Sequence, residues 1–457
     1  MKGLISWLIV AVAGFVLMAF SYFNYQYDAS PNPWKDAFMY IGKGQPHSEA
    51  EGLEYVTRSV RLLPMPRRAQ NFTQIARSFG PGIEKSYCAS FQEKVVLYSD
   101  LTADFTSEML LSGRLPQGTD EVVAGFQATS KDKITINGHS FNIVGQFKKE
   151  VGLFANSYLV YDDGTASGLF DTNEEAVQQA YILRLPRKQL SDSQTRELLT
   201  EAFPKSEFTL YYPIIRTQRG PFYLYIGGIS LLFLGGCLVL FKLYCLLSDR
   251  LGNKWLRMPL VAIRKYKHLF LTIHLIYFGT VVLFMLIAYH LPELQACLLA
   301  GVKSQVEDGS GPLGVAGKAY MSKNILRAAV TTLAINFTFG SLAAITLPSV
   351  IVPGVGVLVA GVRALLWGLL LAPSFHALSA PMLPHSITLL LEGEAYVIAA
   401  FFGLLILIYL FRKSEGPGLA SRYGKALLLN VTANLLVAIV LAIAAIYEAI
   451  EVILCLP

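Results

Sequence analysis

Ionisable side chains interrupt one of the apolar stretches of this chain. His385 stands at the start of a run that continues to Leu410, and Glu392 and Glu394 lie within it. An ionisable group at membrane depth is costly, so it usually faces a protein interior or a wet cavity rather than lipid. The membrane part of the protein is therefore expected to do more than anchor an outer part.

The spacing of these residues assigns them to particular sides of a helix. His385 and Glu392 are seven residues apart, which is two helical turns, so they share a face with Thr388 between them. Glu394 points to roughly the opposite side. With a cation from an earlier apolar segment, these residues define a candidate intramembrane polar site: Arg363, His385, Thr388, Glu392 and Glu394.

Two interpretations of this polar site are open. The functional one is a polar pocket, or an ion or proton relay, between helices. The structural one is a cap at a helix mouth, with Arg363 paired to Glu392 or to Glu394, because an unpaired guanidinium in lipid would be expensive.

Further polar residues lie within or near the ends of apolar runs. The polar residues within the runs are expected to form hydrogen bonds between helices. They are His274, Asn336, Asn430 and Asn434. Glu448 and Glu451 lie near the end of the last run, where we expect water to solvate them.

The composition indicates an integral membrane protein. Of 457 residues, 53% are hydrophobic and only 15% are charged, which is too apolar for a soluble chain of this size. The five cysteines form no CxxC pair, and no GxxxxGK[ST] phosphate-binding loop occurs. The chain itself is therefore predicted to be no enzyme and to hold no metal or cofactor, and ATP would act only through a partner. No nucleic-acid partner is expected.

Apolar runs predict about seven membrane-spanning helices. The first is interpreted as an uncleaved signal anchor rather than a signal peptide, because its apolar core is long and a small-x-small cleavage site is missing. The run at 352–373 is broken by proline and glycine, so a re-entrant pair of half-helices is the alternative there. The predicted spans are 4–23, 221–247, 268–290, 324–347, 352–373, 386–411 and 426–452.

Residues 24–220 differ from the rest because they are polar and contain no spanning run. We expect an α+β extracytoplasmic domain between the first two spans, with a helix from Ser191 to Ala202 and a hairpin turn at Asn137-Gly138. The predicted strands are 94–98, 133–136, 141–144, 158–161, 180–184 and 208–211.

Basic residues concentrate in two loops, 248–267 and 412–425. By the positive-inside rule both loops are cytoplasmic, which puts residues 24–220 outside. The first loop also interleaves cations with apolar residues, which favours an amphipathic helix. This helix either docks a partner or only sets the topology. Its candidate coupling residues are Arg250, Lys254, Trp255, Arg257, Arg264 and Lys265.

Two parts of the chain each resemble a different protein family. The strings LSGRLP at 111–116, DEVVAG at 120–125, KITING at 133–138 and FNIVG at 141–145 are similar to the MacB-like periplasmic core domain. That domain lies between the first and second helices of permeases of the FtsX/MacB/LolC class, which has the same order of helix, outer domain, helix and basic loop. The resemblance implies that loop 248–267 docks on a separate ATPase, and that the permease works as a homodimer or beside a second membrane subunit.

The second resemblance covers about 320–411. The segments 322–325, 340–361, 383–385 and 392–395 are similar to the stage II sporulation protein M membrane family, with Ser386 where that family carries glycine. This resemblance implies a membrane subunit that is often associated with ABC-type transport machinery.

The expected protein is therefore a permease-like subunit of an ABC-type complex in a bacterial cytoplasmic membrane, surrounded by lipid. A partner ATPase would drive export or extraction of a lipid, peptide or lipoprotein, or mechanical signalling. The alternative is a scaffold that transports nothing and recruits envelope, cell-wall or secretion factors through its outer domain. The expected domains are 1–23, 24–220, 221–320 with its basic loop, and 321–457.

Overall fold

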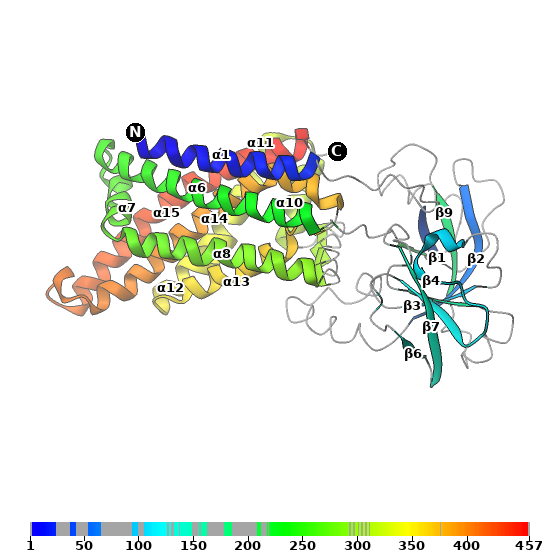
Figure 1. Ribbon diagram of the computed structural model, residues 1–457. Helices are drawn as coiled ribbons and strands as arrows, with labels where there is room; N and C mark the ends of the chain where they lie inside the picture. The colour runs from blue at the N-terminus through cyan, green and yellow to red at the C-terminus, as the bar shows by residue number, and fades with distance from the viewer. Residues whose placement is uncertain are drawn as a thin grey trace. The chain divides into compact units, whose positions relative to one another are not determined.

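The computed structural model divides the chain into two compact units, each considered by itself (Figure 1). The helical unit comprises residues 1–25 and 216–457, and the sheet unit comprises residues 26–215. The structure describes residues 2–23, 37–42, 54–64, 94–98, 105–125, 128, 132–136, 138–148, 154, 157–161, 178–184, 208–211, 217, 219–291, 294–295, 298–299, 301–302, 305–306, 309, 311–374 and 376–455.

The helical unit contains six helical stretches that are long and apolar enough to cross a membrane, among the residues described. They identify the chain as a polytopic helical membrane protein, as the composition predicted. Four of the six are single helices: α1 (Lys2–Phe23), α6 (Arg219–Arg250), α8 (Lys267–His290) and α14 (His376–Phe411). The fifth is continuous and consists of α11 (Ile325–Ile335), the π-helical segment η4 (Asn336–Thr346) and α12 (Leu347–Ile351). The sixth consists of α15 (Leu419–Ile450) and the π-helical segment η6 (Glu451–Cys455).

The segment predicted as a seventh span is shorter than expected. Pro353 and Gly354 form a turn after α12, and the helix that follows, α13 (Val355–Leu370), has only 16 residues. A helix of that length rises about 24 Å, less than the roughly 30 Å of a bilayer core. Gly354 adopts φ +92°, a left-handed conformation that glycine permits. The sharp turn is thus the reason that the apolar run yields one shorter helix.

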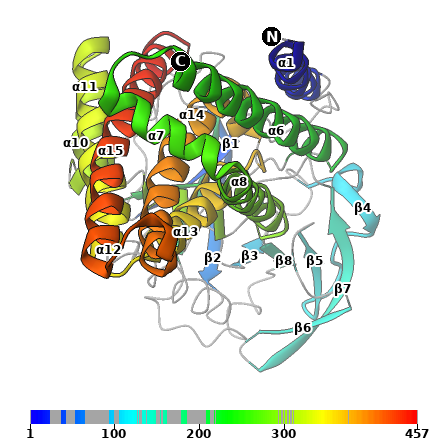
Figure 2. The same ribbon diagram turned by 90° about the vertical axis from the view of Figure 1, so that its left-hand side faces the viewer.

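Helix α14 is the centre of the helical unit. Every residue from Glu392 to Gly403 is buried, and a helix that is buried all round lies inside a bundle. It contacts α6, α8, α13, α15 and η4, and the four α-helices of this group lie around it in Figure 2. Among the described residues, the unit also contains the shorter amphipathic helix α7 (Lys254–Lys265), α10 (Gly311–Met321) and the single turn η5 (Lys413–Glu415).

Helices α1 and α6 pack along each other through glycines. A Cβ atom added at Gly14 would lie 2.5 Å from the Gly228 carbonyl oxygen, and one at Gly235 would lie 2.5 Å from the Ala11 backbone nitrogen. Small residues of this kind allow membrane helices to approach closely. Near the end of α1, the Ser21 hydroxyl donates to the Pro221 carbonyl at 2.5 Å. The two helices on either side of the sheet unit in the sequence therefore pack as a pair.

The sheet unit contains one mixed sheet of ten strands. All six predicted strands are present, and Gly138 has the positive φ that its hairpin turn requires. Asn137 and the predicted helix 191–202 lie outside the described residues. The strands are β1 (Ala37–Gly42), β2 (Glu54–Pro64), β3 (Lys94–Tyr98), β4 (Leu110–Gly113), β5 (Glu121–Ala124), β6 (Lys133–Ile136), β7 (His139–Phe147), β8 (Ser157–Tyr161), β9 (Gln178–Arg184) and β10 (Phe208–Tyr211).

The strand order is β10-β1-β9-β2-β3-β8-β5-β7-β4. Strand β6 lies outside this order and pairs antiparallel with β7. Most neighbours are antiparallel, but β3 pairs parallel with β8, and β5 pairs parallel with β7. Alternate residues of β5, β6 and β8 point into an apolar core, since side chains alternate between the faces of a sheet. The core comprises Val122, Ala124, Ile134, Ile136, Phe141, Tyr158 and Val160.

The connection from β4 to β5 is fixed by an ion pair. Arg114 binds the Glu121 carboxylate through both terminal nitrogens, and the Gln117 backbone N–H donates to the same carboxylate at 2.9 Å. The Arg114 guanidinium, followed by this backbone donor, lowers the pKa of Glu121 to about 2. The charged strings of the sequence at 111–125 therefore have a structural role in this turn.

The α1–α6 contact predicts unequal effects of two adjacent substitutions. We expect Gly228→Ala to lower the stability of the detergent-solubilised protein by about 1–3 kcal/mol, because its methyl group would overlap Gly14 and Met18. Gly227→Ala is the matched control, since the nearest atom there is a Leu17 methyl carbon 3.9 Å away. Thermal unfolding of both variants measures the difference. Equal stabilities would contradict the packing.

The Arg114–Glu121 pair predicts a pH dependence in the sheet unit. Folding lowers the Glu121 pKa from 4.5 to about 2, so the stabilisation is fully present above pH 4.5 and is lost as pH falls toward 2. In the full chain, hydrogen exchange of β4 and β5 amides, corrected for intrinsic rates, should show this loss. At neutral pH, Glu121→Gln should speed exchange roughly 1.5- to 5-fold.

Glu108→Gln, which alters an exposed carboxylate of the same unit, is the control for this measurement. It should retain the wild-type dependence on pH. A Glu121→Gln variant that keeps the full wild-type dependence would show that another group is responsible.

Candidate functional site in the membrane core

In the described part of the helical unit, three clusters of buried and half-buried polar groups lie beside α14. The first joins the beginning of α14 to the end of the last helix. His385 Nδ1 lies 3.1 Å from Glu451 Oε1, and the Thr388 hydroxyl donates to Glu451 Oε2 at 2.8 Å. The prediction that water solvates Glu451 is wrong, because Glu451 is only 2% exposed. Its carboxylate instead links two of the predicted site residues.

The second cluster contains Glu392. The Asn336 side-chain amide donates to Glu392 Oε1 at 2.5 Å from the first residue of η4. π-Helical segments often occur at functional sites. Glu448 of α15 lies beside Glu392, and one of its carboxylate oxygens is shielded from solvent. Water therefore does not surround Glu448 as predicted. The carboxylates of Glu392, Glu448 and Glu451 form a series from α14 to α15 and η6.

Arg363 of α13 lies near this series but has a different partner from the one predicted. Its guanidinium donates to the Tyr396 hydroxyl at 2.7 Å and lies 4.0 Å from the centre of the Tyr396 ring and 5.6 Å from that of Trp367. Among the described residues, no ion pair joins it to Glu392 or Glu394. Aromatic faces attract a guanidinium, most strongly away from water, so the cation is stabilised without a direct carboxylate contact.

The third cluster lies on the opposite side of α14, as the helical spacing predicted for Glu394. Glu394 Oε2 is 2.7 Å from His274 Nε2, and the other ring nitrogen of His274 bonds the Phe270 carbonyl at 2.8 Å. Cys237 of α6 completes the group, since its sulfur, a ring nitrogen of His274 and a Glu394 oxygen lie within 4.8 Å of one another. All three residues are buried.

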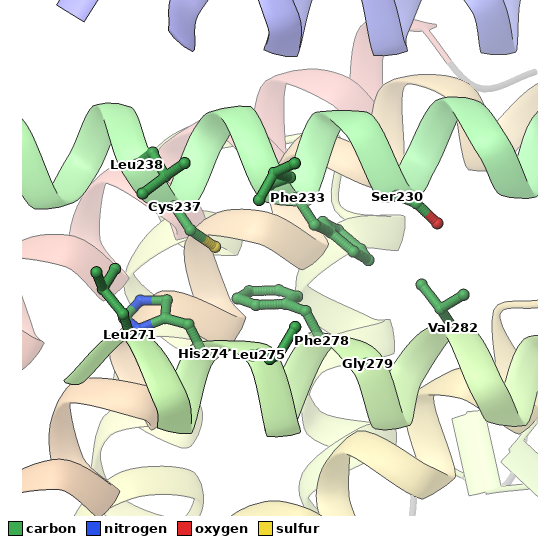
Figure 3. A pocket seen from close by; sticks show the side chains of 11 residues that line it. Ser230, Phe233, Cys237, Leu238, Leu271, His274, Leu275, Phe278, Gly279 and Val282 are labelled. Atoms are coloured by element: carbon green, nitrogen blue, oxygen red, sulfur yellow. The ribbon is translucent and has the colours of Figure 1, made fainter. Parts of the chain in front are cut away.

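Cys237 and His274 point into a cavity between α6 and α8, as Figure 3 shows. The cavity has a volume of about 390 Å³ and a mostly apolar lining. Leu234 and Leu275, which line it, are 50% and 73% exposed. The cavity thus extends from the outer surface of the helical unit to the polar cluster.

The predicted coupling residues lie on or beside α7. Asn253 caps this helix by accepting from the Trp255 and Leu256 backbone N–H groups. Arg264 donates to Asp249 at 2.7 Å, and Arg257 donates to the Ser248 carbonyl at 3.1 Å, so both attach α7 to the end of α6. Arg250, Lys254 and Trp255 are exposed. Lys265 lies over the Tyr266 ring, with its ammonium nitrogen 5.1 Å from the ring centre.

The two basic loops of the sequence meet at one end of the helical unit, which we call the basic end. The Arg412 guanidinium donates to the Tyr266 hydroxyl at 3.2 Å, and α7 contacts both α6 and α15. The structure therefore brings 248–267 and 412–425 together, although about 150 residues separate them.

The sequence identified part of this site. Of the expected hydrogen bonds between helices, those of His274 and Asn336 are confirmed, and Asn434 accepts from Thr346 at 3.4 Å. The spacing of residues along the sequence did not link Cys237 to His274, because they lie on different helices. No sequence pattern indicated Tyr396 as the partner of Arg363. A search for apolar runs that each contain one possible ligand could have found Cys237.

No protein-family model, curated protein or solved structure matches this chain. The class that the structure defines is a polytopic helical membrane protein with a separate unit built around a β-sheet.

The Arg363 contact predicts different results for two tyrosine substitutions. Tyr396→Phe should lower the stability of the solubilised protein by about 1–3 kcal/mol, because the half-buried guanidinium loses its acceptor. Tyr277→Phe is the control, since the Tyr277 hydroxyl is buried and has no hydrogen-bond partner in the described part of the chain. It should be neutral or stabilising. Thermal unfolding tests both, and an equal loss would contradict this role of Tyr396.

Proposed function

We propose that this protein is the permease-like subunit of an ATP-driven, ABC-type complex in a bacterial cytoplasmic membrane. A separate ATPase docks on the basic end, and its cycle moves the helices that hold the ends of the sheet unit. The work done is export or extraction of a lipid, peptide or lipoprotein, or mechanical signalling across the membrane. One observation carries the proposal: α7, which connects α6 to α8 in the sequence, exposes a cationic surface.

The basic end supports a cytoplasmic docking surface. Cations concentrate on the cytoplasmic side of membrane proteins, and here two separate basic loops meet through Arg412 and Tyr266. The other end of the helical unit contains Thr217, whose hydroxyl donates to the Pro373 carbonyl, and Tyr289 near the end of α8. On the proposed orientation, that second end is extracytoplasmic, and so is the sheet unit. The MacB-like resemblance carries the same implication.

The proposed orientation requires that successive loops alternate between the two sides of the membrane, and the short helix α13 is compatible with this requirement. Gly354 at its start lies beside Leu404 and Leu407, near the end of α14. At its other end, the Leu370 carbonyl accepts from the Gln295 side chain at 3.1 Å. Although it is shorter than the other membrane helices, α13 thus runs from near the basic end toward the opposite end. On the proposed orientation it would be a seventh pass, with the two chain termini on opposite sides.

Helix α7 has the two surfaces that a coupling element requires. Its inner face buries apolar residues, including Leu260 and Ile263, against the rest of the unit. Its outer face exposes Lys254 together with Trp255 and Val261, which are 54% and 46% exposed. Tryptophan is enriched in the cores of protein interfaces, and polar residues form their rims, so this face is the proposed ATPase contact.

Motion of α7 would be transmitted along α6. The Arg264–Asp249 and Arg257–Ser248 contacts fasten α7 to the end of α6, and α6 packs tightly on α1 through Gly14 and Gly228. Because α1 precedes the sheet unit and α6 follows it, a movement of this helix pair acts on both ends of that unit. The stage II sporulation protein M resemblance of 320–411 fits a membrane body that supports such movement.

Co-purification tests the proposal. The full chain, isolated in mild detergent from its native membrane, should bring an ABC-type ATPase with it. The double variant Lys254→Glu with Trp255→Ala should lose most of this ATPase, because it alters the exposed face of α7 and none of its internal contacts. Lys318→Glu is the matched control, since Lys318 is an exposed lysine on α10, which packs near the far end of the last helix and away from the basic end; it should retain the ATPase.

Two results would overturn the proposal. One is a native complex that contains envelope or cell-wall factors and no ATPase, which would favour the scaffold alternative. The other is retention of the ATPase by the α7 double variant.

A further inference from the structure

We propose that Cys237, His274 and Glu394 bind a divalent transition-metal ion, with zinc favoured, inside the helical unit. Each residue comes from a different helix, namely α6, α8 and α14, and each offers a ligand atom within 4.8 Å of the other two. The ligand atoms of a tetrahedral zinc lie roughly 3.3–3.7 Å apart, given its bond lengths. The three side chains therefore need only small adjustments to surround an ion.

The histidine is oriented as a metal ligand requires. His274 Nδ1 lies 2.8 Å from the Phe270 carbonyl, which can only accept a hydrogen bond, so the Nδ1 proton is directed there. That bond leaves Nε2 facing Glu394 at 2.7 Å. Histidines that bind metals usually donate their other ring N–H to a carbonyl or carboxylate in this way.

Two polar atoms beside the cluster lack partners. Glu394 Oε1 and the Tyr244 hydroxyl are buried neighbours, but neither forms a hydrogen bond of good geometry within the described part of the chain. The Tyr244 hydroxyl lies next to the Glu394 carboxylate. Buried polar groups normally have partners, and an ion with a bound water or other fourth ligand would supply them.

Charge also favours a divalent ion. A thiolate, a neutral imidazole and a carboxylate carry two negative charges, which one divalent cation neutralises. A neutral cluster is far less costly at membrane depth than an uncompensated carboxylate. The mixed sulfur, nitrogen and oxygen ligands suit zinc better than magnesium or calcium, which prefer oxygen alone. Three protein ligands leave one position for an exogenous ligand.

This metal site goes beyond the proposed ATPase coupling and does not depend on it. Its ion would join α6 and α8, which flank α7 in the sequence, to the central helix α14. Metal binding by the purified chain requires no ATPase, so the two proposals can fail separately.

Metal binding by the full chain in detergent tests the inference. After treatment with a chelator, the protein should bind one equivalent of zinc, and cobalt at the same site should give the visible spectrum of a tetrahedral thiolate complex. Cys237→Ser, His274→Gln and Glu394→Gln should each weaken zinc binding by more than about 100-fold, since even loss of a supporting residue costs 10- to 100-fold. Magnesium should not compete.

Matched controls lie on the same helices. Cys245→Ser on α6 and His290→Gln at the end of α8 should bind zinc as the wild type does. Zinc should also protect Cys237, identified by mass spectrometry, from alkylation by a maleimide while leaving Cys245 reactive.

X-ray absorption by the cobalt-loaded wild type keeps the inference falsifiable if a variant does not fold. It should detect one sulfur ligand. Absence of stoichiometric binding, a metal surrounded only by nitrogen and oxygen, equal competition by magnesium, or unchanged binding in folded ligand variants would each overturn the proposed site.

Discussion

The helical unit depends on one constraint: ionisable groups at membrane depth must find partners inside the protein. Helix α14 carries Glu392 and Glu394 through the most enclosed part of the unit, where neither carboxylate can reach bulk water. Their partners come from other helices, Asn336 from η4 and His274 from α8. These bonds select the neighbours of α14 and the rotation of each neighbour about its axis. Apolar contacts alone would specify that arrangement less well, since lipid offers the same apolar surroundings.

The remaining polar contacts extend the same logic toward both ends of α14. At its beginning, His385 and Thr388 bind Glu451, and this carboxylate joins α14 to η6. Tyr396, further along, binds a cation from α13. Beyond the end of α14, Arg412 binds Tyr266 between α7 and α8. These contacts thus join α14 to the last helix and to α13, and they join the segment after α14 to the start of α8.

The two units differ in how directly their sequences predict their structures. In the sheet unit, strand-like apolar segments and turn residues were enough to locate β3, β6, β7, β8, β9 and β10, because the period of a strand is a local property. In the helical unit, apolar runs located the long helices for the same reason. For α13, the proline and glycine at 353–354 marked a break in the sequence, but hydropathy alone did not give the length of the helix that follows. The partner of Arg363 was misjudged, since an aromatic side chain is an apolar residue in any count of hydrophobicity.

The sequence by itself determined the membrane class, the long helices, the separate polar unit and the opposite directions of Glu392 and Glu394, since all of these follow from composition and from the helical repeat. Only the tertiary structure decided which groups meet: Cys237 with His274 and Glu394, Glu451 with His385, and the two basic loops at one end. These residues are far apart in the chain, and their proximity follows from how the helices pack. Packing depends on the summed fit of many side chains from several helices, which no local pattern in the sequence contains.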